Sequence, residues 1–192
     1  MMEMTLKWLD NIDEAKDISR KTGKPILLFF HSEHCSGCKA MIDKTLPDKN
    51  VVLHAGHRFV PAMFEIGEQK NKDLIARHAI EWTPTFLVMD NNNMVGYRMI
   101  GYMPPEEFRA QLSYGEGQLA FQKGDYGKAS ECFDDAYKKH PKSDIASEAM
   151  YYAGVCKYKQ SKDVNDLKNT YNSLKQSYPD SIWTRKASVW SG

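Results

Sequence analysis

Residues 25–38 read PILLFFHSEHCSGC, and this stretch decides the fold. Its first half, PILLFF, is a continuous apolar run that is too short for a buried helix and is bounded by turn-forming and polar residues. The run therefore predicts a strand buried on both faces. Its second half places Cys35 and Cys38 where the strand gives way to a helix that continues to Ile42. The pattern predicts a pair of cysteines at the start of a helix beside a buried strand.

Segments on both sides of this stretch complete an α/β pattern over residues 1–113. Residues 11–22 have the periodicity of an amphipathic helix that ends at Gly23. We expect further strands at 59–66, 85–89 and 95–100, helices at 73–78 and 105–112, and a loop around Ala55-Gly56. The last two strands would form an antiparallel hairpin. This order predicts a mixed sheet covered by helices.

The final part of the chain, residues 114–192, differs in composition and predicts a second domain. Strand-like runs give way to segments rich in Tyr, Lys, Ala, Ser and Asp. A shift of 38 residues aligns Asp125 with Asp163 and His140-Pro141 with Tyr178-Pro179. Each unit predicts two antiparallel helices, the second of which stops before a proline. The tail therefore predicts about two copies of a helical repeat.

The composition indicates a folded protein with nearly balanced charge. The chain has 192 residues, 42% of them hydrophobic, and 26 Lys and Arg against 25 Asp and Glu give a net charge of +1. This balance argues against a nucleic-acid partner. No window approaches the run of about 18 apolar residues that a transmembrane segment needs, and no signal peptide is evident at the start. We expect a cytoplasmic protein as the sequence stands, or a periplasmic one if a signal peptide has been removed.

The two paired cysteines have the spacing of a redox couple. A cysteine in the first turn of a helix lies near unsatisfied backbone N–H groups, which stabilise its thiolate. Cys35 is therefore the candidate nucleophile. Cys38 lies one turn inward and would be the resolving thiol, because its sulfur can reach Cys35 but is less open to solvent. Attack by Cys35 on a substrate disulfide, followed by attack of Cys38, would reduce the substrate and oxidise the pair.

A metal site is the alternative use of the same spacing, since His31 and His34 would complete a Cys2His2 set. The chain has no second C-x-x-C, and the strand-to-helix position favours redox chemistry. We therefore expect no metal and no cofactor. His34 would instead be a cation beside the thiolate. Cys132 and Cys156 lie on apolar helical stripes and are expected to be small buried packing residues.

A second motif, Trp82-Thr83-Pro84, directly precedes the strand predicted at 85–89. In this architecture that position lies beside the sulfurs of the cysteine pair. We predict a cis Thr83–Pro84 peptide bond, which would present the Thr83 backbone to a substrate strand, while Trp82 forms a hydrophobic wall. An ordinary trans proline that opens the strand is the alternative.

These motifs resemble the thioredoxin superfamily, and especially the thioredoxin-like domain at the C-terminus of the thiol:disulfide interchange protein DsbD. The resemblance also includes Trp8, Glu14-Ala15, Lys24-Pro25 and Thr45-Leu46. The tail resembles tetratricopeptide repeats of the kind found in periplasmic scaffold proteins of bacteria. The resemblance implies an α/β thioredoxin fold followed by an all-α repeat, and thiol:disulfide oxidoreductase activity on protein disulfides or dithiols.

The chain departs from thioredoxins at the redox pair. His34 replaces the Trp that usually precedes the first cysteine, and Ser36-Gly37 replaces Gly-Pro. Phe29 stands where many thioredoxins have a buried Asp that takes a proton from the resolving cysteine. Because Phe29 cannot accept a proton, water, Glu81 or His34 would have to do so for Cys38. The direction of electron flow stays open.

Two functions of different kinds follow from these observations. The leading hypothesis is an oxidoreductase in which Thr83 also offers a hydroxyl to the Cys35 thiolate, and the repeat binds a peptide, a client protein or a redox partner. The alternative is a protein-binding adaptor or chaperone-like module whose C-x-x-C is non-catalytic or binds metal.

Overall fold

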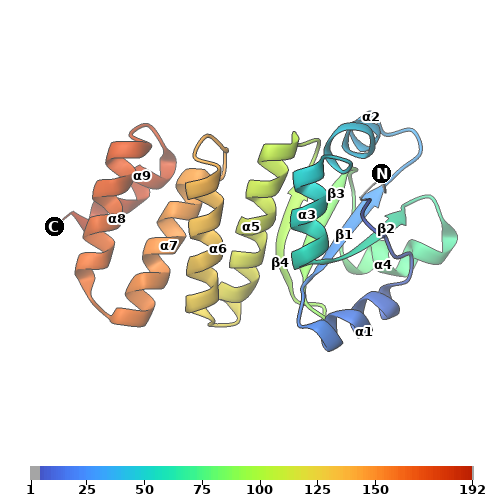
Figure 1. Ribbon diagram of the computed structural model, residues 1–192, viewed down its shortest axis with the longest axis horizontal. Helices are drawn as coiled ribbons and strands as arrows, with labels where there is room; N and C mark the ends of the chain where they lie inside the picture. Colours follow the sequence, from blue (N-terminus) through green and yellow to red (C-terminus); the bar gives the residue numbers. More distant parts are fainter. Residues whose placement is uncertain (1–4, 192) are drawn as a thin grey trace. The chain divides into compact units, whose positions relative to one another are not determined.

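The computed structural model describes residues 5–191. The chain divides into two compact units, Met1–Arg109 and Ala110–Gly192 (Figure 1). The first unit contains a mixed sheet with helices, and the second contains helices. The sheet of the first unit has the strand order β2-β1-β3-β4. Its strands are β1 (Ile26–His31), β2 (Val60–Glu65), β3 (Thr85–Met89) and β4 (Val95–Ile100). Strand β1 pairs in parallel with β2, and β3 is antiparallel to both β1 and β4. The mixed sheet and its terminal hairpin are as predicted.

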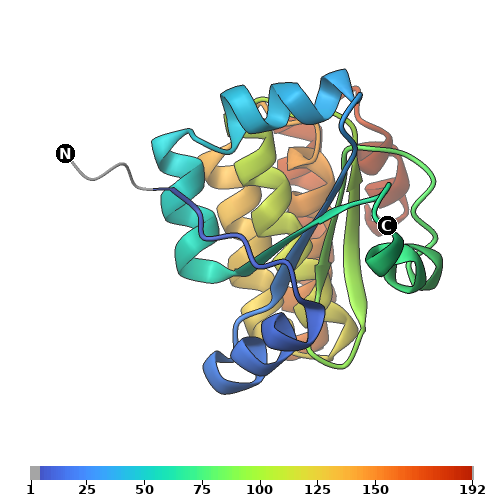
Figure 2. The same cartoon turned by 90° about the vertical axis from the view of Figure 1, so that its right-hand side faces the viewer.

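Helices cover both faces of this sheet (Figure 2). Those that begin in the first unit are α1 (Ile12–Thr22), α2 (Ser36–Ala40), a π-helical turn η1 (Met41–Thr45), α3 (Lys49–Arg58), a short 3-10 turn η2 (Gln69–Asn71), α4 (Lys72–Arg77) and α5 (Pro105–Gln122). Alternate residues of β1 point to opposite faces. Ile26, Leu28 and Phe30 pack in a core with residues of α1 and α4. Phe29, on the other face, stacks on Phe86 with ring centroids 4.3 Å apart. The strand is therefore buried on both faces, as predicted.

Helices α3 and α5 differ from the sequence prediction. The expected loop around Ala55-Gly56 is part of α3, whose N-cap Asp48 accepts hydrogen bonds from the Asn50 and Val51 N–H groups. Helix α5 was expected to end at residue 112, but it continues through Gly117 to Gln122. Glycine is needed there for packing, because a Cβ at Gly117 would lie 2.7 Å from the Phe133 ring. The predicted domain boundary between residues 113 and 114 stays a proposal.

The second unit is all-α, as predicted (Figure 1). After α5 it contains α6 (Tyr126–Lys139), α7 (Ala146–Ser161), α8 (Val164–Ser177), α9 (Ile182–Ala187) and the 3-10 turn η3 (Ser188–Trp190). Asp125 and Asp163 are the N-caps of α6 and α8, and His140 and Tyr178 are their C-caps. The shift of 38 residues therefore aligns the N-cap of α6 with the N-cap of α8 and the C-cap of α6 with the C-cap of α8, as expected for a structural repeat. Within residues 5–191 no helix combines the length and apolarity needed to cross a bilayer.

Candidate functional site

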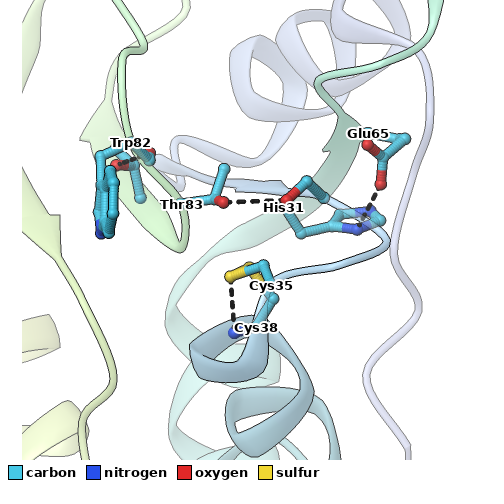
Figure 3. The surroundings of a disulfide bond; sticks show 8 residues. His31, Cys35, Cys38, Glu65, Trp82 and Thr83 are labelled. Atoms are coloured by element: carbon cyan, nitrogen blue, oxygen red, sulfur yellow. Dashed lines mark hydrogen bonds and ion pairs between the residues drawn. A yellow bond between two sulfur atoms is a disulfide. The ribbon is translucent and has the colours of Figure 1, made fainter.

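A disulfide bond between Cys35 and Cys38 lies just beyond the end of β1 (Figure 3). Cys35 is the N-cap of α2, and its Sγ accepts a hydrogen bond from the Cys38 backbone N–H at 3.0 Å. Cys35 is partly exposed, whereas Cys38 is only 1% exposed. Both features agree with the prediction of an accessible first cysteine at a helix start and a buried second one. In the reduced protein the same N–H group would stabilise a Cys35 thiolate.

A groove of about 510 Å³ lies beside Cys35 and includes the Trp82-Thr83-Pro84 segment. The Thr83–Pro84 peptide bond is cis, as predicted. The Trp82 side chain is 68% exposed and lines this groove. A Cβ at Gly37 would lie 3.0 Å from Cδ of Pro84, so the close approach of α2 to the proline favours glycine at this position. The groove therefore presents an exposed aromatic side chain and backbone next to the sulfur of Cys35.

Three further candidate side chains, Thr83, His34 and Glu81, have different surroundings in the structure. The Thr83 hydroxyl forms a hydrogen bond with Ser32 Oγ at 3.2 Å, rather than with a sulfur atom (Figure 3). His34 is exposed and lines the Trp82 groove, whereas Cys38 does not line it. Glu81 is exposed and lines neither this groove nor the second groove beside the disulfide. His34 therefore lines the groove on the Cys35 side of the pair, Glu81 lines neither groove, and their roles toward Cys38 stay predictions.

The second groove, of about 740 Å³, is lined by both cysteines and by His31 and Glu65. His31 Nδ1 lies 3.1 Å from Glu65 Oε2. His31 was expected only as a metal ligand and Glu65 was not expected at the site, because the pairing of β1 with β2 is not visible in the sequence. Among residues 5–191 no group of three or more His, Cys, Asp and Glu side chains is arranged to hold a metal ion. His31 faces Glu65 and His34 is exposed, and the Cys2His2 alternative stays untested.

His78, at the end of α4, is a buried histidine in the same unit. Its Nε2 has no hydrogen-bond partner within the described part of the chain. Burial lowers the pKa of His78, and the positive charges of Arg77, Arg98 and Lys16 lower the pKa further. His78 is therefore held neutral in the folded protein at pH values where it would be protonated in the unfolded chain.

Mild acid should consequently destabilise the protein through His78. Below the ordinary histidine pKa of about 6.5, the unfolded chain binds a proton that the folded protein does not bind. The free energy of unfolding therefore falls as the pH drops through that value, and it levels off only below the folded-state pKa. Urea unfolding of the wild type and of His78→Leu, measured from neutral to mildly acidic pH, should show a flatter pH dependence for the variant. An unchanged slope would assign the effect to other groups.

Comparisons with known proteins agree with this geometry. The family model of the thioredoxin-like domain matches residues 12–116, and a tetratricopeptide-repeat model matches residues 148–181. The thiol:disulfide interchange protein DsbD of Ralstonia nicotianae is 27% identical over 109 residues, which are 56% of this chain and 18% of that protein. The chain therefore corresponds to less than a fifth of the length of DsbD.

Two solved structures have a similar fold. A thioredoxin from Thermus thermophilus is 25% identical, with a TM-score of 0.51, and the match covers 68% of this chain and 95% of that one. The oxidised C-terminal domain of DsbD from Neisseria meningitidis is 15% identical, with a TM-score of 0.50, covering 57% of this chain and 99% of that one. Since the matched residues 12–116 are more than half of the chain, the protein belongs to the thioredoxin-like domain family and carries a tetratricopeptide-repeat-like tail.

Proposed function

We propose that the protein is a thiol:disulfide oxidoreductase that acts on protein disulfides or dithiols through Cys35 and Cys38. The observation that carries this proposal is the partly exposed Cys35 sulfur, placed at a helix start beside the groove of the cis proline, with Cys38 buried behind it. The family membership supports the same class of chemistry.

The proposed reaction is an exchange of one disulfide for another. The Cys35 thiolate attacks a sulfur of the substrate disulfide, forms a mixed disulfide and releases one substrate thiolate. The Cys38 thiolate then attacks Cys35, releases the second substrate thiolate and leaves the pair oxidised. The substrate gains two electrons and the pair loses them, and the reverse sequence oxidises a dithiol. Trp82 and the backbone of Thr83 and Pro84 would hold the substrate segment in the groove beside Cys35.

The repeat would recruit the client or the redox partner of this site. This part of the proposal rests on the match of residues 148–181 to tetratricopeptide repeats. The groove and the repeat would then both recognise polypeptide, in keeping with the small net charge of +1.

Reduction of insulin in the presence of a dithiol tests the proposed activity. The wild-type chain should accelerate the reduction, whereas Cys35→Ser should leave only the uncatalysed background, because a hydroxyl is not ionised at neutral pH and cannot replace the thiolate. Equal rates for the wild type and Cys35→Ser would favour the adaptor function in place of the enzyme. A Cys132→Ser variant serves as the control for loss of a thiol, because Cys132 is buried in the second unit.

A further inference from the structure

The buried thiol of Cys38 needs a proton acceptor, and Phe29, at the position where many thioredoxins have a buried Asp, cannot supply one. Cys38 must lose its proton before its sulfur can attack the mixed disulfide, since the thiolate is the nucleophile. Cys38 is 1% exposed, and the side chain at the position of the thioredoxin Asp is the buried Phe29. The Phe29 ring stacks on Phe86 and has no group that accepts a proton. Water or another side chain near the pair must therefore accept the proton.

His31 lies on the face of β1 that carries Phe29. Side chains two residues apart on a strand share a face, and the ring centroids of His31 and Phe29 are 5.4 Å apart. The His31 side chain is 21% exposed and lines the second groove together with Cys35 and Cys38. Figure 3 shows the His31 imidazole, its Glu65 partner and the two cysteines grouped around the end of β1. His31 therefore lines the same groove as Cys38, the residue whose thiol must lose a proton.

Glu65 fixes the orientation of this imidazole. His31 and Glu65 lie opposite each other in the parallel pairing of β1 with β2. One carboxylate oxygen of Glu65 contacts His31 Nδ1 at 3.1 Å, and the other accepts the Gly67 backbone N–H at 3.0 Å. Nδ1 is thus the ring nitrogen that faces the carboxylate, and a neutral imidazole that carries its hydrogen on Nδ1 has its lone pair on Nε2. Within residues 5–191, Nε2 has no hydrogen-bond partner.

We propose that His31 is the general base for Cys38 and that Glu65 is the positioning residue for His31. This inference rests on the proposed oxidoreductase function. His31 Nε2 accepts the Cys38 proton, directly or through a water molecule in the groove, and the Glu65 carboxylate stabilises the imidazolium that forms. The Cys38 thiolate then forms the bond to Cys35 and displaces the substrate thiolate. In the reverse direction the imidazolium returns the proton to Cys38 as its bond to Cys35 breaks.

The two exchange steps can be timed separately with dithiodipyridine as the substrate disulfide. The reduced full-length chain should release one thiopyridone when Cys35 attacks, and a second one when Cys38 resolves the mixed disulfide. In His31→Gln the first step should be unchanged. The second step should be at least about tenfold slower near neutral pH, and its pH midpoint should rise by about one unit or more, because the Cys38 thiolate loses its partner. Glu65→Gln should slow the same step by a smaller factor.

Glu68 offers a matched control for the loss of a negative charge. It lines the same groove, but its carboxylate pairs with Lys70 at 3.1 Å and not with His31. The other charged side chains of this groove are Glu33, Lys39 and Asp43, of which the last two pair with each other at 2.7 Å. Glu68→Gln should therefore leave both steps unchanged. A variant with Ser at both Cys35 and Cys38 gives the background from the two remaining cysteines.

The outcomes separate this inference from the proposed function. If the wild type releases no thiopyridone above the background, the proposed function itself is wrong. If His31→Gln resolves the mixed disulfide at the wild-type rate and with the wild-type pH profile, His31 is not the general base. Equal slowing of both steps in His31→Gln, or equal effects of Glu65→Gln and Glu68→Gln on the second step, would also overturn the inference. Selective slowing of the second step by His31→Gln and Glu65→Gln supports it.

Discussion

A Cys38→Ser variant should accumulate as a covalent complex with its client through Cys35. Cys35 is partly exposed and caps α2, so that its attack on a substrate disulfide does not need Cys38. Without the resolving sulfur the mixed disulfide has no intramolecular route to release. The complex should therefore change from a trace species in the wild type to the main species in the variant. Non-reducing electrophoresis and intact mass measurement would detect the complex, and added dithiol should reduce the mixed disulfide and release the client.

Cys35→Ser is the matched control for this trap. Cys38 is 1% exposed and should not capture a client by itself. The other thiols should not compete, since Cys132 and Cys156 are buried and burial raises the pKa of Cys156 to about 12. If Cys35→Ser formed as much complex as Cys38→Ser, the assignment of nucleophile and resolving thiol would have to be reversed or abandoned.

Gly154→Ala should destabilise the helical repeat strongly. Gly154 on α7 is buried, and its Cα faces the side chain of Thr170 on α8. An added Cβ would lie 2.6 Å from the Thr170 Cβ and would also overlap Oγ1 and Cγ2. Thr170 is buried and its hydroxyl donates to the Asp166 carbonyl oxygen at 2.7 Å, so it cannot rotate away freely. Overpacking of this kind costs about 1–3 kcal/mol.

Thermal unfolding followed by circular dichroism would measure this loss of stability. The Tm should fall by several degrees, the usual response of a unit of this size to a loss of about 1 kcal/mol or more. Gly127→Ala on α6 is the matched control without overpacking, because the atom nearest to an added Cβ would be Gln160 Oε1 at 3.7 Å. Alanine at this exposed position in the first turn of α6 should leave the stability unchanged or raise it slightly. Equal effects of the two substitutions would contradict the packing argument.

The sequence was informative where the local pattern decides the structure. The apolar run before Cys35 predicted β1, because a strand buried on both faces leaves a distinctive pattern. The cap residues Asp125 and Asp163 recur at the repeat period and were aligned correctly by sequence alone. The cis peptide before Pro84 was predicted from its place in the fold rather than from any property of proline itself.

Tertiary packing explains what the sequence did not reveal. The sequence predicted a helix that ends at residue 112, but α5 continues through Gly117. A glycine is present at this helical position because the Phe133 ring of α6 leaves no room for a side chain. The contact of His31 with Glu65 depends on the register of β1 against β2, and the two residues are 34 positions apart in the chain. Helix α3 was missed because Gly56 interrupts its pattern, although its N-cap Asp48 was visible in the sequence.

The disulfide separates two grooves, and this separation bears on how the protein can diverge or be engineered. Trp82 and Pro84 line one groove, whereas His31 and Glu65 line the other, and Cys35 lies between them. Under the proposed function, selection on the Trp82 side would alter which clients are accepted while the proposed proton transfer at Cys38 is preserved. A library of substitutions confined to the Trp82 groove is accordingly the place to search for new client preferences with the exchange chemistry intact.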